Sequence, residues 1–268
     1  MSPHLFLSHL RAARWGLVAW SGLMGLYALL VFYLYPVMKE AGYEQMFEKM
    51  PESIKAMAGL QDLPSGIGLS LEAFVAAEFL SSWAAVVVIY AIFAAGGIVA
   101  REVERGTMDL ILAQPLSRTR LVLSKFAVFL AGVGIIAMGS FLGFLAGMAV
   151  FDETMSLGNT ALALFQGVSL VLAVGSYSLL LSCLTLDPRR TLLLSGTITA
   201  AFYILNFVAP ALKGYTWAGR FSLFHYFSPE PIMRTGQPDW WGLGIFWGLA
   251  LICLALSLSV FRRRDIVA

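Results

Sequence analysis

The side chains that most often bind metals or act as nucleophiles are few and scattered in this sequence. The three histidines are His4, His9 and His225, and the two cysteines, Cys183 and Cys253, both lie inside apolar runs. Neither cysteine has a partner at the CxxC spacing, so neither zinc binding nor a disulfide is indicated. We interpret the cysteines as small core residues, and we expect no metal centre in this chain.

Nucleotide chemistry within the chain is not indicated either. The sequence has no GxxxxGK[ST] pattern, the loop that cradles nucleotide phosphates. No carboxylate pair or nucleophile–base pair is evident in the apolar runs, which makes a membrane-embedded enzyme the weakest alternative. The net charge of +2 is too small to suggest a nucleic-acid partner. We therefore expect no catalytic residue and no cofactor in this chain.

The composition is that of a membrane protein. Hydrophobic residues make up 59% of the 268 residues and charged residues only 13%, against about 25% charged in ordinary soluble domains. Apolar residues continue almost from end to end. We therefore expect one transmembrane domain over residues 1–268, surrounded by membrane lipid, with no soluble domain attached.

Stretches without Asp, Glu, Lys or Arg locate the membrane spans. Six occur, at 15–38, 79–100, 126–151, 154–186, 191–212 and 240–261. Even a run of 22 residues makes about 33 Å of helix, enough for a hydrocarbon layer of about 30 Å. The fourth run begins with polar residues, so its crossing is placed at 161–186. The predicted fold is all-α, with six transmembrane helices.

The distribution of Lys and Arg predicts the orientation. The N-terminus, the 101–125 loop, the 187–190 turn and the C-terminus together hold twelve basic and five acidic residues. The 39–78 loop, the 152–153 turn and the 213–239 loop together hold six basic and eleven acidic residues. Because basic residues favour the cytoplasmic side, both termini are predicted to be cytoplasmic. We expect a multi-pass protein of the plasma membrane, the inner membrane in a bacterium or archaeon.

Three segments outside the spans carry structural signals. Residues 4–14 fit either a short interfacial helix under the membrane or the basic flank of the first span. The external loop 39–78 has apolar residues at helical spacing, which favours amphipathic helices on the outer surface. Residues 213–239 are rich in aromatic residues, and Pro229 and Pro231 prevent a long helix. We predict that this last segment forms a short re-entrant or lid-like element.

Small and polar residues within the spans have two possible roles. Gly139, Gly143 and Gly147 recur every four residues and form a smooth strip for helix packing, which we expect within the chain more than between chains. Gln166 and Asn206 could line a transport pathway. Polar side chains in spans more often hydrogen-bond between helices, so packing is the favoured reading for both.

The cytoplasmic loop 101–125 has a readable local structure. The second span can continue as a helix until Gly106 stops it. Thr107 is a good N-cap for a short helix at about 108–113, and Asp109 would lie favourably in its first turn. Pro115 disfavours helix at the residue before it, and Ser117 can cap the third span.

The short 108–113 helix is almost wholly apolar. In the aqueous cytoplasm its apolar side chains would need another surface to cover them. In one interpretation the helix folds back onto the membrane surface. The other inserts it into a groove on a cytoplasmic protein.

The run ERGTMDLILAQPLSR at 104–118 resembles the signature of type-2 ATP-binding-cassette permeases, the ABC-2 superfamily. In that signature an acidic residue, Gly-Thr, a hydrophobic turn, Pro and Ser/Thr-Arg follow the second span. The resemblance extends over nearly the whole chain, from the N-terminal segment to the aromatic stretch with Ser228-Pro229 before the last span.

The resemblance implies that this loop docks on a separate nucleotide-binding ATPase subunit, which would hold ATP and Mg. It also implies an assembly of two permeases with two ATPases. By resemblance the coupling element covers 102–113, and its candidate residues are Glu102, Glu104, Arg105, Gly106, Thr107, Met108, Asp109, Leu110 and Ile111. The apolar, aromatic-rich interior favours export of a hydrophobic or lipid-like substrate.

An ion-coupled secondary transporter is the main alternative. Such proteins place ionisable groups at the middle of the membrane. The six runs contain no Asp, Glu, Lys or Arg, and none contains a histidine. Their composition disfavours this alternative.

Overall fold

Six long helices form the molecule in the computed structural model, which describes residues 3–40, 70–106, 117–211 and 216–263. The long helices are α1 (Pro3–Glu40), α5 (Ser81–Glu104), α7 (Arg118–Phe151), α8 (Leu157–Thr185), α9 (Pro188–Val208) and α11 (Trp240–Arg263). All six are long and apolar enough to cross a membrane. The prediction of six crossing helices in an all-helical fold is confirmed to that extent.

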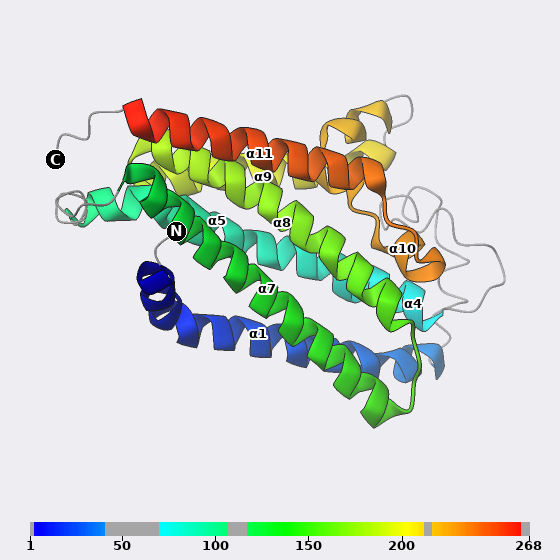
Figure 1. Ribbon diagram of the computed structural model, residues 1–268. Coiled ribbons are helices and arrows are strands. Elements are labelled where there is room, and N and C mark those ends of the chain that lie inside the picture. Colours follow the sequence, from blue (N-terminus) through cyan, green and yellow to red (C-terminus); the bar gives the residue numbers. More distant parts are fainter. Residues whose placement is uncertain (1–2, 41–69, 107–116, 212–215, 264–268) are drawn as a thin grey trace.

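The helices lie side by side, and the chain alternates between the two ends of the bundle (Figure 1). The start of α1, the start of α7 and the end of α11 lie toward one end. The start of α8 and the short helix α10 (Pro229–Thr235) lie toward the other. Which end faces the cytoplasm is still a prediction from the charge distribution. The end that holds the start of α7 is called the inner end below.

The helices pack as two groups. Helix α1 packs mainly on α7, while α8, the most buried of the long helices, packs on α5 and α11. Helix α9 packs on α5 and α8. The core includes large, fully buried side chains such as Trp83, Phe79 and Phe144.

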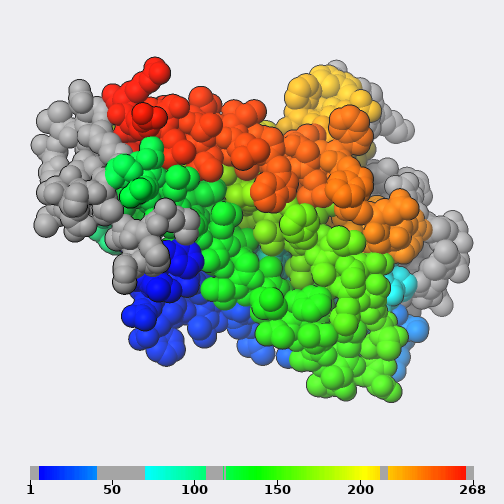
Figure 2. Space-filling view, in the orientation of Figure 1, coloured from blue at the N-terminus to red at the C-terminus, as the bar shows by residue number. Residues whose placement is uncertain are grey.

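Large apolar side chains cover the outside of the bundle. Figure 2 shows one face of the molecule, to which α1 in blue, α7 and α8 in green and α11 in orange and red contribute. Exposed residues on α1, α7 and α11 include Val18, Leu23, Leu26, Met138, Leu142, Leu251 and Ile252. So many exposed apolar side chains would cause association in water, whereas they suit contact with lipid.

The second crossing helix begins before the charge-free run 79–100. Ser70 caps α4 (Leu71–Phe74) by accepting a hydrogen bond from Ala73 N, and a π-helical segment, η1 (Val75–Leu80), joins α4 to α5. Residues 71–78, predicted as the end of an external loop, are therefore helical. Apolar side chains drive this extension, because Phe74 and Val75 are buried on the same turns that expose Glu78. The proposed amphipathic helices within 41–69 lie outside the described residues.

Residues 4–14, the segment with two readings, are the first turns of α1, which runs without a break to Glu40. In Figure 1 these dark-blue turns stand at an angle to the rest of α1. Their position relative to the membrane surface is still a prediction.

The aromatic segment before α11 turns back into the helix bundle. It contains η3 (Thr216–Phe221), η4 (Leu223–Tyr226) and α10. Ser222 Oγ donates to Phe202 O of α9 at 2.6 Å, and Gln166 Nε2 of α8 donates to Tyr226 O at 2.8 Å. Gln166 is nine residues into α8, so the contact lies about 14 Å along that helix. This path fits the predicted re-entrant element, and α10 is short, as its prolines require.

Candidate functional site

The inner end of α5 is shaped by its glycine stop. Helix α5 ends at Glu104, and Gly106 adopts a φ of +65°, a left-handed conformation that favours glycine. The Gly106 N–H donates to Val103 O at 3.0 Å and closes the last turn. The sequence predicted this stop. Glu104 and Arg105 are exposed beside it, where a partner protein can reach them.

The middle of the candidate coupling element lies outside the described residues. This applies to Thr107, Met108, Asp109, Leu110 and Ile111, and to the short helix predicted at 108–113. The structure resumes at Ser117, whose Oγ accepts from Arg120 N and caps α7, as the sequence predicted. The segment therefore connects the inner ends of α5 and α7.

Glu102 forms a contact that the sequence did not suggest. Its carboxylate lies 2.6 Å from Lys125 Nζ of α7, and the two side chains are only 18% and 9% exposed. Lys125 Nζ also donates to Ile98 O at 3.4 Å. The family resemblance assigned Glu102 to partner contacts, and it gave no sign of a pairing with Lys125, which is 23 residues further along the chain. Breaking a largely buried charged pair leaves one charge without its partner, which is costly.

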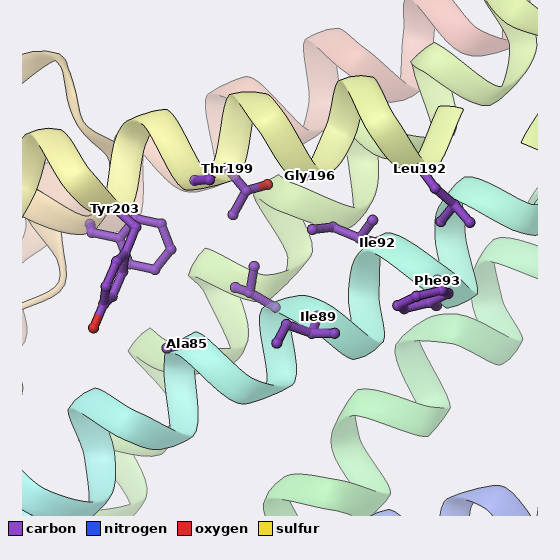
Figure 3. A pocket seen from close by; sticks show the side chains of 11 residues that line it. Ala85, Ile89, Ile92, Phe93, Leu192, Gly196, Thr199 and Tyr203 are labelled. Atoms are coloured by element: carbon purple, nitrogen blue, oxygen red, sulfur yellow. The ribbon is translucent and has the colours of Figure 1, made fainter. Parts of the chain in front are cut away.

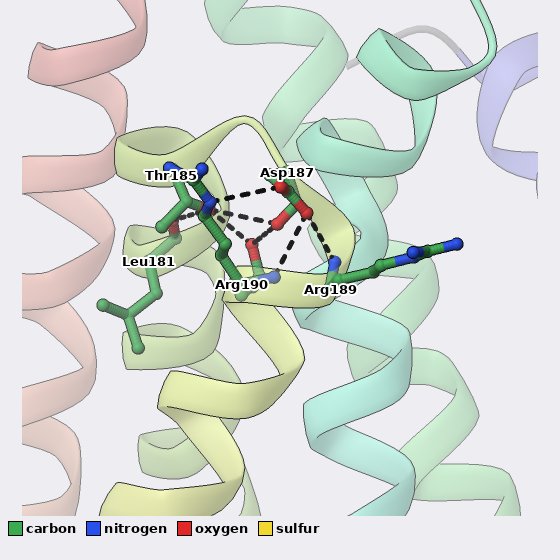
Figure 4. A network of polar contacts seen from close by, with 6 residues as sticks. Leu181, Thr185, Asp187, Arg189 and Arg190 are labelled. Atoms are coloured by element: carbon green, nitrogen blue, oxygen red, sulfur yellow. Dashed lines mark hydrogen bonds and ion pairs between the residues drawn. The ribbon is translucent and has the colours of Figure 1, made fainter.

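The turn between α8 and α9 is a second polar feature at the inner end (Figure 4). Asp187 caps α9 by accepting from Arg189 N at 2.8 Å and Arg190 N at 3.1 Å. Thr185 and Thr191 join across the turn, with their hydroxyl oxygens 2.6 Å apart. These bonds fix the turn, while the side chains of Arg189 and Arg190 stay exposed.

The glycine strip of α7 faces α1. A Cβ atom on Gly143 would lie 2.8 Å from Gly25 Cα, and one on Gly147 would lie 2.7 Å from Phe32 Cγ. A Cβ on Gly139 would meet the side chain of Ser21. The structure thus places all three glycines in a close helix crossing within the chain.

The two candidate pathway residues occupy different environments. Gln166 is buried and holds the aromatic segment through Tyr226 O, and its Oε1 accepts from Asp239 N at 3.4 Å. The Gln166 amide therefore hydrogen-bonds α8 to the aromatic segment, which agrees with the packing role. Asn206 is partly exposed on α9, one turn beyond the residues that line the pocket described next.

An apolar pocket of about 460 Å³ lies between α5 and α9 (Figure 3). Sequence reasoning missed it, because its walls come from two helices about a hundred residues apart and no single stretch carries a signal. Its lining consists of Ala85, Val88, Ile89, Ile92, Phe93, Leu192, Gly196, Thr199, Ala200, Tyr203 and Phe224. Thr199 and Tyr203 are the hydroxyl-bearing residues of this lining, and Thr199 Oγ1 donates to Ser195 O at 2.7 Å and also contacts Tyr177 OH. Its volume lies in the range of small-molecule sites.

Side chains that can bind metal ions are dispersed in the part of the chain that the structure describes. No group of three or more His, Cys, Asp or Glu side chains there could hold a metal ion. Cys183 and Cys253 are both buried, in keeping with small core residues. His225 is exposed and makes an edge contact with Tyr226.

Six long apolar helices give the chain the fold of a multi-pass membrane protein. Residues 21–266 match the family described as ABC-2 family transporter protein, and the chain belongs to that family. ABC-2 membrane permeases lack an ATPase domain, in agreement with the missing phosphate-binding loop. No curated protein matches the sequence.

Proposed function

We propose that this chain is the membrane subunit of an exporter driven by a separate ATPase, which docks on residues 102–113. The carrying observation is that the chain has the membrane domain of the ABC-2 family but no phosphate-binding loop of its own. The family implies an ATPase partner. The exposed Glu104 and Arg105, at the end of α5, supply charged contacts beside the apolar 108–113 turn.

Coupling follows from where the loop is attached. Two chains and two ATPases associate, and ATP binding closes the ATPase pair. The closure moves the 102–113 segments, which begin in the last turn of α5 and pull on the inner end of that helix. The six-helix halves then change between inward-open and outward-open states. Because the chain supplies only binding and movement, ATP and Mg belong to the partner.

The pocket between α5 and α9 supports a hydrophobic or lipid-like substrate. Its walls are almost wholly aliphatic and aromatic, which suits an apolar molecule. Helix α9 lines the pocket and also contacts the aromatic segment through the Tyr203–Phe224 ring pair. A movement of α5 against α9 would therefore change the shape of the pocket.

Charge reversal at the docking surface tests the proposal. The variants E104K and R105E are co-expressed with the cognate ATPase, and the complex is isolated through a tag on the permease. We expect both variants to lose most of the co-purifying ATPase, because like charges that meet at an interface cost several kcal/mol. E153K, at the opposite end of the bundle, should retain it. Full retention of the ATPase by E104K and R105E would contradict the docking assignment.

A further inference from the structure

The Glu102–Lys125 ion pair joins α5 and α7, the two helices that the coupling loop connects. Its Nζ–Oε1 distance is 2.6 Å, in the range of a short charge-assisted hydrogen bond. Other ion pairs in the described ranges, Arg190–Asp187 and Arg234–Glu230, are local and join residues three or four positions apart. The Glu102–Lys125 pair instead links α5 to α7.

The two helices that it links belong to different groups of the bundle. Helix α5 packs mainly on α8 and α9, whereas α7 packs mainly on α1. Further from the loop, α5 and α7 also meet where Trp83 Nε1 donates to Ser140 Oγ at 2.8 Å. Of these two contacts between α5 and α7, the ion pair lies nearer the loop.

We propose that the Glu102–Lys125 pair is a strut that makes α7 follow α5 when the ATPase moves the coupling loop. This inference rests on the proposed function and adds a positioning role for two residues inside the chain. Coupling between distant sites is carried by packed side chains, ion pairs and rigid elements. With the strut intact, one displacement at the loop reaches both helix groups. Without it, α5 can move while α7 and α1 stay behind.

The test uses the whole permease–ATPase complex in lipid nanodiscs and needs no transported substrate. An environment-sensitive fluorophore is attached at V150C on α7 or, separately, at L193C on α9, positions that are 68% and 70% exposed. The chain without an added cysteine serves as the blank, since Cys183 and Cys253 are buried. Emission is recorded before and after addition of Mg and a non-hydrolysable ATP analogue.

Four variants separate the strut from general stability: E102Q, K125M, the charge swap E102K/K125E, and the control E230Q, which removes one charge from a local pair. In the parent complex we expect an emission change at both label positions. E102Q and K125M should lose the change at position 150 and keep it at position 193. The charge swap should restore the change at position 150, and E230Q should behave as the parent. Thermal unfolding identifies any variant that fails to fold.

Two results would overturn the strut. One is an unchanged response at position 150 in folded E102Q, and the other is a parent complex in which position 150 does not respond although position 193 does. Failure of the parent permease to form a complex with the ATPase would instead refute the proposed function. The charge swap also has a diagnostic value, because restored movement cannot come from the loss of a charge alone.

Discussion

At Gly143 the backbones of α1 and α7 come so close that a side chain has little room. A Cβ atom there would lie 2.8 Å from Gly25 Cα, a backbone atom that cannot turn aside. Ser21 Oγ, one turn earlier on α1, donates to Ile135 O of α7 at 3.2 Å. Small residues thus allow two helices with apolar outer faces to pack closely in lipid, where no hydrophobic force draws them together.

The first prediction concerns this crossing. G143A should destabilise the protein by about 1–3 kcal/mol, because the added methyl group separates α1 from α7. The matched control is G134A on the same helix, where a Cβ would have no neighbour within 4 Å. Thermal unfolding in detergent measures both variants. Equal melting temperatures for G143A and the parent would show that the crossing is not tight.

At the scale of elements, charge-free stretches predicted the number of crossing helices, and capping residues predicted several ends. Gly106 ends the helix before the coupling loop, and Ser117 begins the next one. The search for charge-free stretches placed the start of the second span too late, because Glu78 ended the stretch on that side. That side chain points outward from a turn whose neighbours Phe79 and Leu80 are fully buried.

Contacts between distant helices could not be predicted from spacing. Nothing local to Glu102 shows that Lys125 will meet it, and the pocket between α5 and α9 has no motif at all. The sequence left two roles open for Gln166, lining a pathway or hydrogen bonding within the bundle. Only its partners in the structure, Tyr226 O and Asp239 N, show which contacts its amide makes. Local rules therefore located the ends of the coupling loop, while the strut and the pocket required the tertiary structure.

The second prediction concerns the aromatic segment that Gln166 holds. Q166L should cost about 1–3 kcal/mol, since it leaves the partly buried Tyr226 O and Asp239 N–H without their Gln166 partner. It should also raise hydrogen exchange within residues 223–239. Q237L makes the same chemical change at an exposed position of that segment and should have little effect. Unchanged exchange in Q166L would mean that the segment is held by its aromatic side chains alone.

At the scale of the whole molecule, the alternation of the chain fixes which segments share a side. The starts of α1 and α7 lie toward the same end of the bundle as the end of α11, and the basic residues predict that this end is cytoplasmic (Figure 1). Cysteine labelling in intact cells gives the third prediction. D152C should react with a membrane-impermeant maleimide from outside, and R189C should react only after permeabilisation. Labelling in the reverse order would invert the topology and move the coupling loop outside the cell.

The central claim is that the loop between α5 and α7 meets an ATPase, and photo-crosslinking from inside that loop tests it most directly. A photoreactive amino acid replaces Leu110 in cells that also express the cognate ATPase, with Leu193 on the exposed face of α9 as the control position. We predict an adduct of permease plus ATPase from position 110 and none from position 193. Adducts from position 110 with lipid or with the permease alone, in the presence of the ATPase, would contradict the account.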